Sequence, residues 1–429
     1  MLKFGENNEV ITEETYRAIL VGVYKDEDIS YSMQELKGLA EAVNAEVLGM
    51  MTQKIDKPNP RTLIGKGKVD ELREMVNNME ADTVIFNDEL KGIELRNLED
   101  ELGVTVIDRT ILILDIFARR ATSSEGKLQV ELAQLKYRLP RLIGFGKSLS
   151  RLGGGIGTRG PGETKLETDR RHIEKRIDEL KKELEELKAV RSTKRKKREK
   201  NEIPIVSLVG YTNAGKSALM NAILSKLGND ETKSVFEKDM LFATLDTSER
   251  RITLDSNQSF ILIDTVGFVS RLPHSLVEAF KATLEDVKYS DLLVHVVDSS
   301  YIESDFQINV TNTVLQEIGA GDKEKIMAFN KVDLLDDSLA LASNIKGSNI
   351  FISAKKDINI DAILDMIKEK IFNDEVKVSL LIPYTRGDIS SYLMEKTNVL
   401  SFEYMEEGTL FNVMLNSKDY LRYKEYETL

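Results

Sequence analysis

The sequence predicts an α/β protein whose main domain has a mostly parallel sheet with helices on both faces. An N-terminal α/β domain, a helical hairpin and a small α+β C-terminal domain accompany it. The main domain is predicted from residues 210–217, Gly-Tyr-Thr-Asn-Ala-Gly-Lys-Ser, which lie between an apolar run at 203–209 and a helical pattern at 218–224. The N-terminal domain is predicted from alternating strand and helix patterns. The hairpin is predicted from two helical segments in which leucine or isoleucine recurs every three or four residues.

A strand, a G-x-x-x-x-G-K-S loop and a helix together predict a phosphate cradle. The glycines let successive backbone N–H groups face phosphate oxygens, and the helix N-terminus adds partial positive charge. Lys216 is expected to reach the β- and γ-phosphates, and the Ser217 hydroxyl to ligate Mg²⁺. The expected nucleotide contacts in this stretch are Gly210, Asn213, Ala214, Gly215, Lys216, Ser217 and Ala218.

Three further motifs occur in order, each after a strand-like run. Asp264 and Gly267, in Asp-Thr-Val-Gly, are expected near the metal and the γ-phosphate. In Asn-Lys-Val-Asp, Asp333 can accept guanine N1 and N2 protons while Asn330 braces the loop and Lys331 lies along the base. The third motif is Ser353, Ala354 and Lys355, with the Ala354 N–H facing the guanine carbonyl. Open α/β sheets bind ligands at the carboxyl ends of their strands, so the four motifs predict a GTP/GDP-binding domain at residues 201–373.

The hydrolytic site is predicted to be incomplete. Residues 242–247 offer hydroxyls for Mg²⁺, of which Thr244 is the first choice and Thr247 the reserve, and Lys216, Thr244 and Gly267 are the expected catalytic group. Phe268 stands where many GTPases have a glutamine that orients the attacking water. A phenyl ring cannot do this by hydrogen bonding, so slow intrinsic hydrolysis is expected. Either Asn213 helps to hold a K⁺ ion or a macromolecular partner completes the site.

Composition sets limits on the chain. Its 429 residues suffice for two to four domains, and 41% hydrophobic residues support sizeable cores. There are no cysteines, which excludes disulfides, thiol catalysis and Cys-based zinc sites. No apolar run approaches the roughly 18 residues needed to span a bilayer, and no signal peptide is recognisable, so a cytoplasmic protein is expected.

The net charge of −12 is unevenly distributed. Residues 119–200 contain 24 Lys/Arg and 12 Asp/Glu, a net of +12, so the remaining residues carry −24. A basic module inside an acidic chain indicates a localised contact with a polyanion.

Residues 1–118 are expected to form the N-terminal domain. Strand-like runs occur at 17–23, 46–51, 83–86 and 104–107, with helical patterns at 33–43, 69–79 and 93–102. This alternation predicts a small parallel sheet flanked by helices. Gly65 and Gly67, just before a helix, could hold phosphate or form a solvated loop.

Residues 119–200 are expected to form the second module. Leucines from 128 to 139 repeat at spacings of four and three, and Pro140 should stop that helix. A second helix is expected from about 167 to 200, because Ile173, Ile177, Leu180, Leu184 and Leu187 repeat as in a coiled coil. The two seams can face one another in a hairpin, or one helix can dock alone on a neighbouring domain.

A glycine-rich basic loop, residues 140–165, joins these helices, with eight glycines from Gly144 to Gly162. Long loops without secondary structure are usually functional or disordered. Arginine, lysine and bare backbone suit folded RNA, although a flexible linker remains open. The basic run 191–200 is either a solvated helix end or a second RNA contact. Residues 374–429 are expected to add a strand, a helix and two further strands.

Residues 153–165 read Gly-Gly-Gly-Ile-Gly-Thr-Arg-Gly-Pro-Gly-Glu-Thr-Lys, and Asp-Arg-Arg-His follows at 169–172. In this stretch the chain resembles the HflX family of ribosome-associated GTPases. The resemblance extends to residues 61–68, 211–217, 242–246 and 264–268, and Phe268 matches the family's hydrophobic replacement of the glutamine.

The resemblance implies that the protein binds the large ribosomal subunit and its rRNA in the GTP state, splits stalled or idle ribosomes, and is released by hydrolysis. A monomer is expected. Some members are also described as binding ATP or remodelling RNA through the N-terminal part. The alternatives are a large-subunit assembly GTPase, a signalling switch with a protein-binding hairpin, and an ATP-driven RNA remodeller. The residues expected to contact RNA are Arg141, Lys147, Arg151, Gly154, Arg159, Lys165, Arg170 and Arg171.

Overall fold

The structure, a computed structural model, describes residues 15–142, 161–200, 203–227, 242, 247–254, 258–271, 286–335 and 347–428. The chain divides into two compact units. The first comprises Met1–Thr193 together with Lys238–Asp246 and Ser270–Ala282, and the second comprises the remaining segments. No helix among the described residues is both long enough and apolar enough to cross a membrane.

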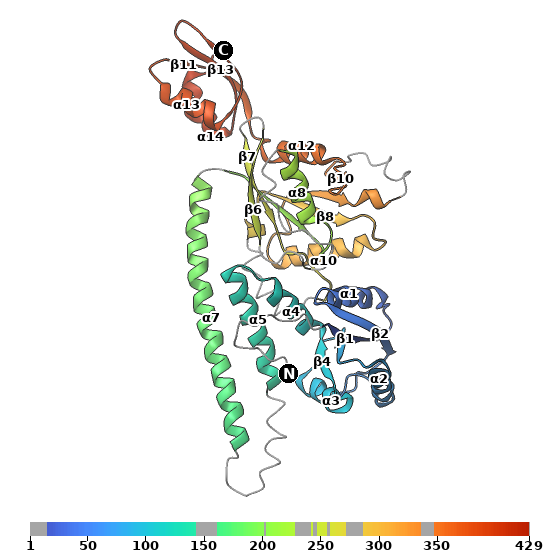
Figure 1. Ribbon diagram of the computed structural model, residues 1–429. Helices are drawn as coiled ribbons and strands as arrows, with labels where there is room; N and C mark the ends of the chain where they lie inside the picture. The colour runs from blue at the N-terminus through green and yellow to red at the C-terminus, as the bar shows by residue number, and fades with distance from the viewer. Residues whose placement is uncertain are drawn as a thin grey trace. The chain divides into compact units, whose positions relative to one another are not determined.

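The first unit begins with a four-stranded parallel sheet of order β2-β1-β3-β4 (Figure 1). Its β1 is buried on both faces from Ala18 to Val21, because helices cover both sides. Helices α2 and α3 bury apolar residues against one face, and α1 and α4 pack together. The elements are β1 (Tyr16–Tyr24), α1 (Ser30–Glu41), β2 (Ala45–Lys54), α2 (Lys66–Met79), β3 (Thr83–Phe86), α3 (Gly92–Leu102), β4 (Thr105–Asp108) and α4 (Arg109–Arg120).

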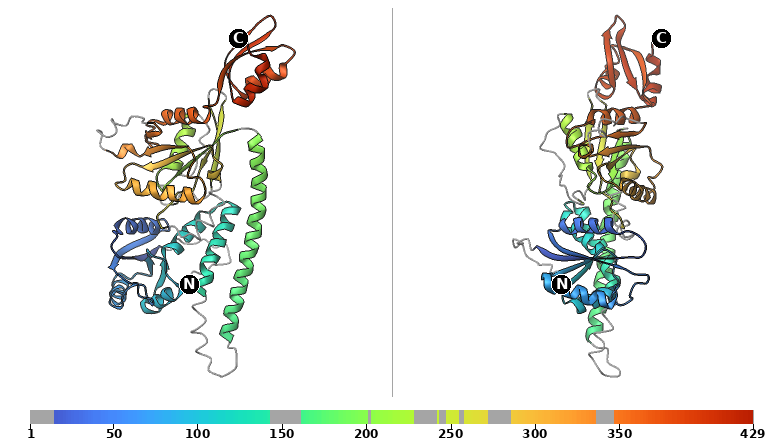
Figure 2. Two further views of the ribbon diagram at one scale, coloured as in Figure 1. Left: turned by 180° about the vertical axis from the view of Figure 1, so that it is seen from behind. Right: turned by 90° about the vertical axis from the view of Figure 1, so that its right-hand side faces the viewer.

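Two long helices complete the first unit and lie side by side in all views (Figures 1 and 2). They are α5 (Ser124–Leu142) and α7 (Pro161–Lys200). Leu132, Ile177 and Leu180 are buried between them, and Leu128, Leu135, Leu139, Ile173 and Leu184 pack around these three. The predicted hairpin with facing seams is therefore confirmed.

Two predicted helix boundaries are wrong. Helix α7 begins at Pro161, because proline suits a first helical turn, where the backbone N–H has no partner to lose. Helix α5 continues through Pro140 to Leu142. Pro140 removes only the helical hydrogen bond to the Lys136 carbonyl, and only two helical residues follow it, so the helix can continue to its end. The Arg141 side chain adds a bond from Nη1 to the Tyr137 carbonyl at 2.9 Å.

The second unit contains a six-stranded sheet of order β10-β9-β8-β5-β7-β6, parallel except for β6 against β7. Helices α8 and α12 pack on one face and α10 on the other, which gives the predicted layered α/β architecture. The elements are β5 (Ile205–Gly210), α8 (Lys216–Lys226), β6 (Ser248–Thr253), β7 (Ser259–Asp264), β8 (Leu292–Asp298), α10 (Ser304–Glu317), β9 (Lys325–Asn330), the 3-10 helix η4 (Val332–Leu334), β10 (Asn349–Phe351) and α12 (Ile360–Ile371).

The C-terminal residues form an antiparallel sheet of order β11-β13-β12 with its own apolar core. Val378, Leu380, Phe411 and Val413 are buried in that core together with Leu393 of α13. The elements are β11 (Val376–Pro383), α13 (Gly387–Lys396), β12 (Asn398–Tyr404), β13 (Gly408–Leu415), α14 (Ser417–Tyr423) and the 3-10 helix η5 (Lys424–Tyr426). The sequence predicted the strands and α13 but not α14.

Candidate nucleotide site

The loop between β5 and α8 has the shape expected of a phosphate cradle. Gly210 has φ +147° and Gly215 has φ +93°, a backbone region that side chains rarely adopt. A Cβ at Gly210 would lie 2.2 Å from the Val296 carbonyl oxygen, and one at Gly215 would lie 2.1 Å from Asn330 Nδ2. Both positions therefore require glycine, and the bare backbone at the start of α8 suits an anionic ligand.

Lys216 is the first residue of α8 and lies inside this loop. Its side chain is buried, and Nζ donates to the carbonyls of Gly210 and Tyr211 at 3.1 and 2.9 Å. Burial lowers the pKa of the Lys216 ammonium to about 8, against a smaller opposing effect of the Asp264 charge. A phosphate at this position would supply the negative charge that favours the protonated form.

Ser217 and Asp264 lie together next to Lys216. The Ser217 hydroxyl donates to Asp264 Oδ2 at 2.6 Å, and Asp264 is fully buried at the end of β7. A hydroxyl and a carboxylate are oxygen ligands of the kind that Mg²⁺ accepts beside a phosphate. These residues therefore fit a Mg²⁺–nucleotide complex. Thr244, the other predicted metal ligand, lies outside the described residues.

The segment after Asp264 runs along the cradle. A Cβ on Gly267 would lie 2.5 Å from Thr212 Cα and 2.9 Å from Lys216 Nζ, so this close approach needs glycine. Phe268 forms a bridge with Tyr211, and its carbonyl accepts from the Thr212 N–H at 2.7 Å. The Phe268 ring is buried in an apolar cluster with β8 and α10. The ring is thus a packing group, in agreement with its lack of any water-orienting chemistry.

The predicted guanine-binding motifs are joined through Asn330. Its Nδ2 donates to the Ala214 carbonyl at 2.9 Å, and its Oδ1 accepts from the Ala354 N–H at 3.0 Å. Asn330 thereby links the phosphate loop to the Ser-Ala-Lys loop, the bracing role expected from the sequence. The Ala354 N–H, expected to face the guanine carbonyl, is used by Asn330 in this structure.

The other residues of these motifs are held by short polar contacts. The Asp333 carboxylate accepts from the Ser353 hydroxyl at 2.5 Å. Lys331 has φ +66° and its ammonium lies 2.7 Å from an Asp298 oxygen. Lys355 is exposed, as are Asn213 on the phosphate loop and, in part, Ala218 on α8. His295 on β8 is buried, and burial lowers its pKa to about 3, so it stays neutral.

The segment directly after the Asp-Thr-Val-Gly motif makes contacts that the sequence did not predict. Ser270 is buried in the first unit, where its hydroxyl donates to Glu35 Oε2 at 2.5 Å and its carbonyl accepts from Arg109 Nη2 at 3.1 Å. Arg109 and Glu35 form a buried ion pair. Residues of α1 and α4 thus hold Ser270 within the first unit.

A second contact of this kind involves the segment before Thr244. The Phe242 ring packs edge-on against Phe117 of α4, with ring centroids 4.6 Å apart, and both rings are buried. For the Ser270 contact, the only local signal in the sequence was a charged residue, Arg109, at the end of a strand-like run. Nothing in the sequence indicated its partners.

Arg141, an expected RNA contact, has an intramolecular role. Its guanidinium donates to the Leu90 carbonyl at 2.8 Å and lies 3.4 Å from the centre of the Tyr137 ring. Tyr137 donates to Asp108 at 2.5 Å, and burial raises the pKa of that carboxyl. Arg141 therefore fixes the end of α5, and with it the start of the glycine-rich loop, to the N-terminal domain.

The remaining expected RNA contacts are on α7 or outside the described residues. Arg170 and Arg171 are exposed on α7, and Arg170 pairs with Glu174 at 2.8 Å. Lys165 lies in the same helix, but its side chain is not described. Lys147, Arg151, Gly154 and Arg159 lie outside the described residues.

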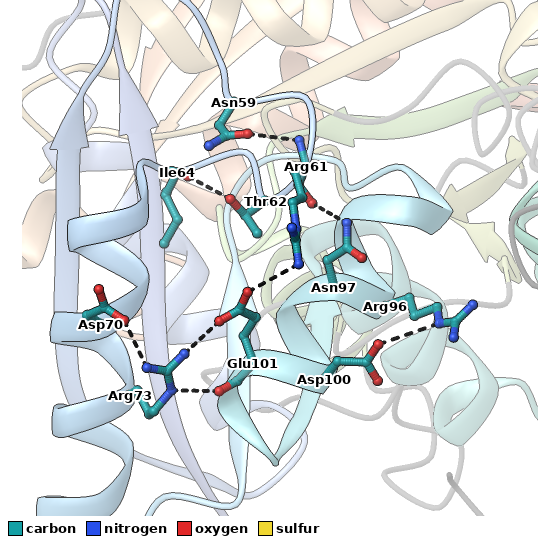
Figure 3. Close-up of polar contacts among 10 residues, drawn as sticks. All are labelled: Asn59, Arg61, Thr62, Ile64, Asp70, Arg73, Arg96, Asn97, Asp100 and Glu101. Atoms are coloured by element: carbon teal, nitrogen blue, oxygen red, sulfur yellow. Dashed lines mark hydrogen bonds and ion pairs between the residues drawn. The ribbon is translucent and has the colours of Figure 1, made fainter. Parts of the chain in front are cut away.

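The stretch before α2, residues 59–65, is stabilised by a polar network (Figure 3). Glu101 pairs with Arg73 at 2.7 Å and with Arg61 at 3.5 Å. The Gly65 N–H donates to Gln53 Oε1 at 3.0 Å. Because this amide already has an acceptor within the domain, the geometry favours a structural loop over a phosphate site. No group of three or more metal-ligating side chains occurs among the residues described.

Comparisons with known proteins agree with this geometry. Family models described as "GTP-binding GTPase N-terminal", "GTP-binding GTPase Middle Region" and "50S ribosome-binding GTPase" match residues 30–118, 120–198 and 205–331. The chain is similar to two proteins named GTPase HflX. One, from Caldanaerobacter subterraneus, is 50% identical over 94% of this chain and 92% of its own length, and the Escherichia coli protein is 39% identical over 91% of each.

Among solved structures, a GTP-binding protein from Sulfolobus solfataricus in complex with GDP is 28% identical, over 83% of this chain and 99% of its own, with a TM-score of 0.44. The glycine-dependent cradle, the guanine-loop brace and the near full-length relatives together define the nucleotide and the reaction. The protein binds GTP and GDP, hydrolyses GTP, and belongs to the HflX family of ribosome-associated GTPases.

Proposed function

We propose that this GTPase binds the large ribosomal subunit in its GTP form and splits stalled or idle ribosomes into subunits, and that hydrolysis releases it. The observation that carries the proposal is the module at residues 119–200, with its net charge of +12, whose two helices are packed along a continuous apolar seam. Such a module can present a basic loop to rRNA. The family model matching residues 205–331 is described as a ribosome-binding GTPase.

Each nucleotide-binding group has a defined part in the proposal. Lys216 neutralises charge on the β- and γ-phosphates, and Gly267 lets the backbone approach the γ-phosphate. Ser217 and Asp264, already in contact with each other, would hold Mg²⁺, and Thr244 would join them in the GTP form. When bound, Mg²⁺ supplies electrophilic stabilisation of the transferring phosphoryl group.

Guanine would be read by Asp333, with Lys331 along the base. The Asp333 carboxylate, held by Ser353, can accept two guanine protons that adenine does not offer. The Asn330 side chain ties this reading loop to the phosphate cradle. Base recognition is thereby coupled mechanically to the position of the phosphates.

Intrinsic hydrolysis is proposed to be slow and to be accelerated by the ribosome. Phe268 is buried in the apolar core and cannot orient water. The missing charge or water orientation must come from elsewhere, and we propose that Asn213, which is exposed on the phosphate loop, helps to hold a K⁺ ion. A partner that orders the segments around Thr244 and Gly267 would raise turnover.

Contact with rRNA is proposed to come from the glycine-rich loop and the start of α7. Arg170 and Arg171 present exposed guanidinium groups there, whereas Arg141 anchors the loop. Because phosphate contacts release counterions, affinity for the subunit should fall steeply as salt concentration rises. We further propose that the protein acts as a monomer in the cytoplasm, as its cysteine-free composition allows.

Sedimentation tests the proposal. Intact ribosomes are incubated with the full chain and GTP, GDP or a non-hydrolysable GTP analogue, then resolved on sucrose gradients. Subunits should appear with GTP and with the analogue but not with GDP, and the analogue should keep the protein on the large subunit. A variant without residues 144–162 should hydrolyse GTP alone at the normal rate and leave ribosomes intact. Ribosomes that stay whole with GTP, while the protein binds large-subunit precursors, would instead identify an assembly factor.

A further inference from the structure

The two edges of the C-terminal sheet differ in whether other parts of the chain pair with them. The outer edge of β11 is partly covered by the end of the chain, because Leu380 forms a bridge with Glu427 and the Thr428 N–H donates to Ser379. The opposite edge is β12, and no described strand pairs with its outer side. An unpaired edge offers backbone N–H and C=O groups to another strand.

Strand β12 carries few of the features that protect exposed edges. Its sequence, Asn-Val-Leu-Ser-Phe-Glu-Tyr, contains no lysine and no proline. A register irregularity between Val399 and Ser401 disrupts only its first half. From Ser401 to Tyr404 the strand pairs regularly with β13, so its outer edge is straight enough there to accept a partner strand.

An aromatic row leads from the domain core to this edge. Phe411 of β13 is buried, Phe402 lies opposite it with ring centroids 6.1 Å apart, and Tyr404 packs edge-on to Phe402 at 5.8 Å. Exposure rises along the row from 2% to 42% and then to 75%. Leu393 of α13 and Tyr423 of α14 are buried in the core on this face, whereas the rings of Phe402 and Tyr404 remain exposed.

Exposed apolar side chains are concentrated in this domain. Among the described residues, eight of 17 large hydrophobic side chains that are exposed lie beyond residue 375, although this part is less than a sixth of those residues. Leu400, Phe402, Tyr404 and Met405 lie on β12 or directly after it, and Tyr384 donates to the Met405 carbonyl at 2.8 Å. Contiguous exposed apolar groups of this kind mark interaction sites.

The charged side chains of β12 and of the turn that follows it are all acidic. Residues 397–417 contain Glu403, Glu406 and Glu407 and no lysine or arginine, and all three carboxylates are exposed. Glu403 points away from the aromatic face, because neighbouring residues of a strand alternate between faces. A partner strand would therefore meet aromatic rings on one side and carboxylates on the other.

We infer that β12 is a docking edge for an extended, cationic segment of a protein, which adds a strand with apolar residues over Phe402 and Tyr404 and lysine or arginine beside Glu403. RNA is disfavoured because the carboxylates repel phosphates, and a second copy of this chain because its own three glutamates would face them. We assign this segment to a protein of the large ribosomal subunit, an assignment that rests on the proposed function. The basic loop would then contact rRNA and the C-terminal edge would contact protein.

A peptide titration tests the docking chemistry without a ribosome. A fluorescent ten-residue peptide that alternates valine with lysine is titrated with the full chain and followed by anisotropy. Binding should weaken at least about tenfold for Tyr404→Ser and for Glu403→Lys, while Tyr289→Ser, at an exposed tyrosine elsewhere in the chain, should bind normally. The same peptide with glutamate in place of lysine should not bind. Equal binding by all variants, or preference for single-stranded RNA, would overturn the inference.

Cross-linking tests the source of the segment. The chain with a photoreactive benzoylphenylalanine at Tyr404 is bound to purified large subunits with a GTP analogue, irradiated, and treated with ribonuclease or protease. The expected adduct resists ribonuclease and contains one subunit protein. An RNA adduct, or no adduct on a chain that pellets with subunits, would overturn it. A chain that fails to pellet at all would refute the proposed ribosome binding, and the peptide titration would still decide whether β12 is a docking edge. An increase in chain mass on sedimentation would identify a second copy as the occupant.

Discussion

The state of the Lys216 ammonium gives a quantitative prediction for nucleotide binding. Burial lowers its pKa to about 8 from an ordinary value of 10.5. Bound phosphates need the charged form and should return the pKa towards its ordinary value. Below pH 8 the free protein already carries the proton, so affinity should vary little there. Above pH 8 Lys216 of the free protein loses its proton and must take one up when the nucleotide binds, so nucleotide affinity should fall as pH rises.

The magnitude comes from the same shift. One pKa unit corresponds to about 1.4 kcal/mol, so raising the pH from 7 to 9 should weaken GDP binding about tenfold. Proton uptake should rise from near zero at pH 7 to nearly one at pH 9. The measurement is isothermal titration calorimetry in pairs of buffers with different ionisation enthalpies.

A Lys216→Arg variant is the matched control, because a guanidinium stays charged throughout this pH range. It should bind with an affinity that is lower overall but flat between pH 7 and 9, and without proton uptake. If wild-type affinity were also flat, or if the arginine variant took up the same proton at pH 9, Lys216 would not be the titrating group.

Three further changes have defined outcomes. Gly215→Ala places a Cβ 2.1 Å from a side-chain nitrogen and should lower GTP affinity by at least about tenfold in calorimetry, whereas Gly67→Ala, which points into open space, should leave it unchanged. Arg109→Met leaves the buried Glu35 carboxylate without its ion-pair partner and should lower the free energy of unfolding by about 3–5 kcal/mol in denaturant titrations followed by circular dichroism. Adding Glu35→Met should recover most of that loss, and no recovery would contradict the buried-pair argument. Leu180→Ala, in the seam between α5 and α7, should cost about 2–5 kcal/mol and speed proteolysis of the hairpin, and an unchanged cleavage rate would mean that the seam is not tightly packed.

The order of the nucleotide motifs could be predicted because each depends on local sequence. Gly210, Asp264 and Asn330 each end an apolar run, and parallel strands bring their carboxyl ends to one edge of the sheet. The heptads in residues 128–139 and 173–187 likewise predicted that two helices would bury a common seam. Periodicity and motif spacing were sufficient in both cases.

Elements without a clear periodic signal were missed. Helix α4 was not predicted, because Arg109–Arg120 is mostly apolar and its pattern does not separate a strand from a buried helix. Strand β6 was also missed, because Ser248–Thr253 is polar and forms an edge that pairs only with β7. Each owes its conformation to neighbours in the fold more than to its own residues.

Local sequence was sufficient to predict which nucleotide the protein binds, the layered α/β architecture and the basic hairpin, since these depend on residues close together in the chain. Only the tertiary structure showed that Ser270 is held by Glu35 and Arg109, that Arg141 fixes the end of α5 to the N-terminal domain, and that Tyr404 lies on a strand at the edge of a sheet. These contacts join residues that are far apart in sequence, or depend on which strand edge remains unpaired. No local pattern records such pairings, because they are fixed only when separate elements pack together.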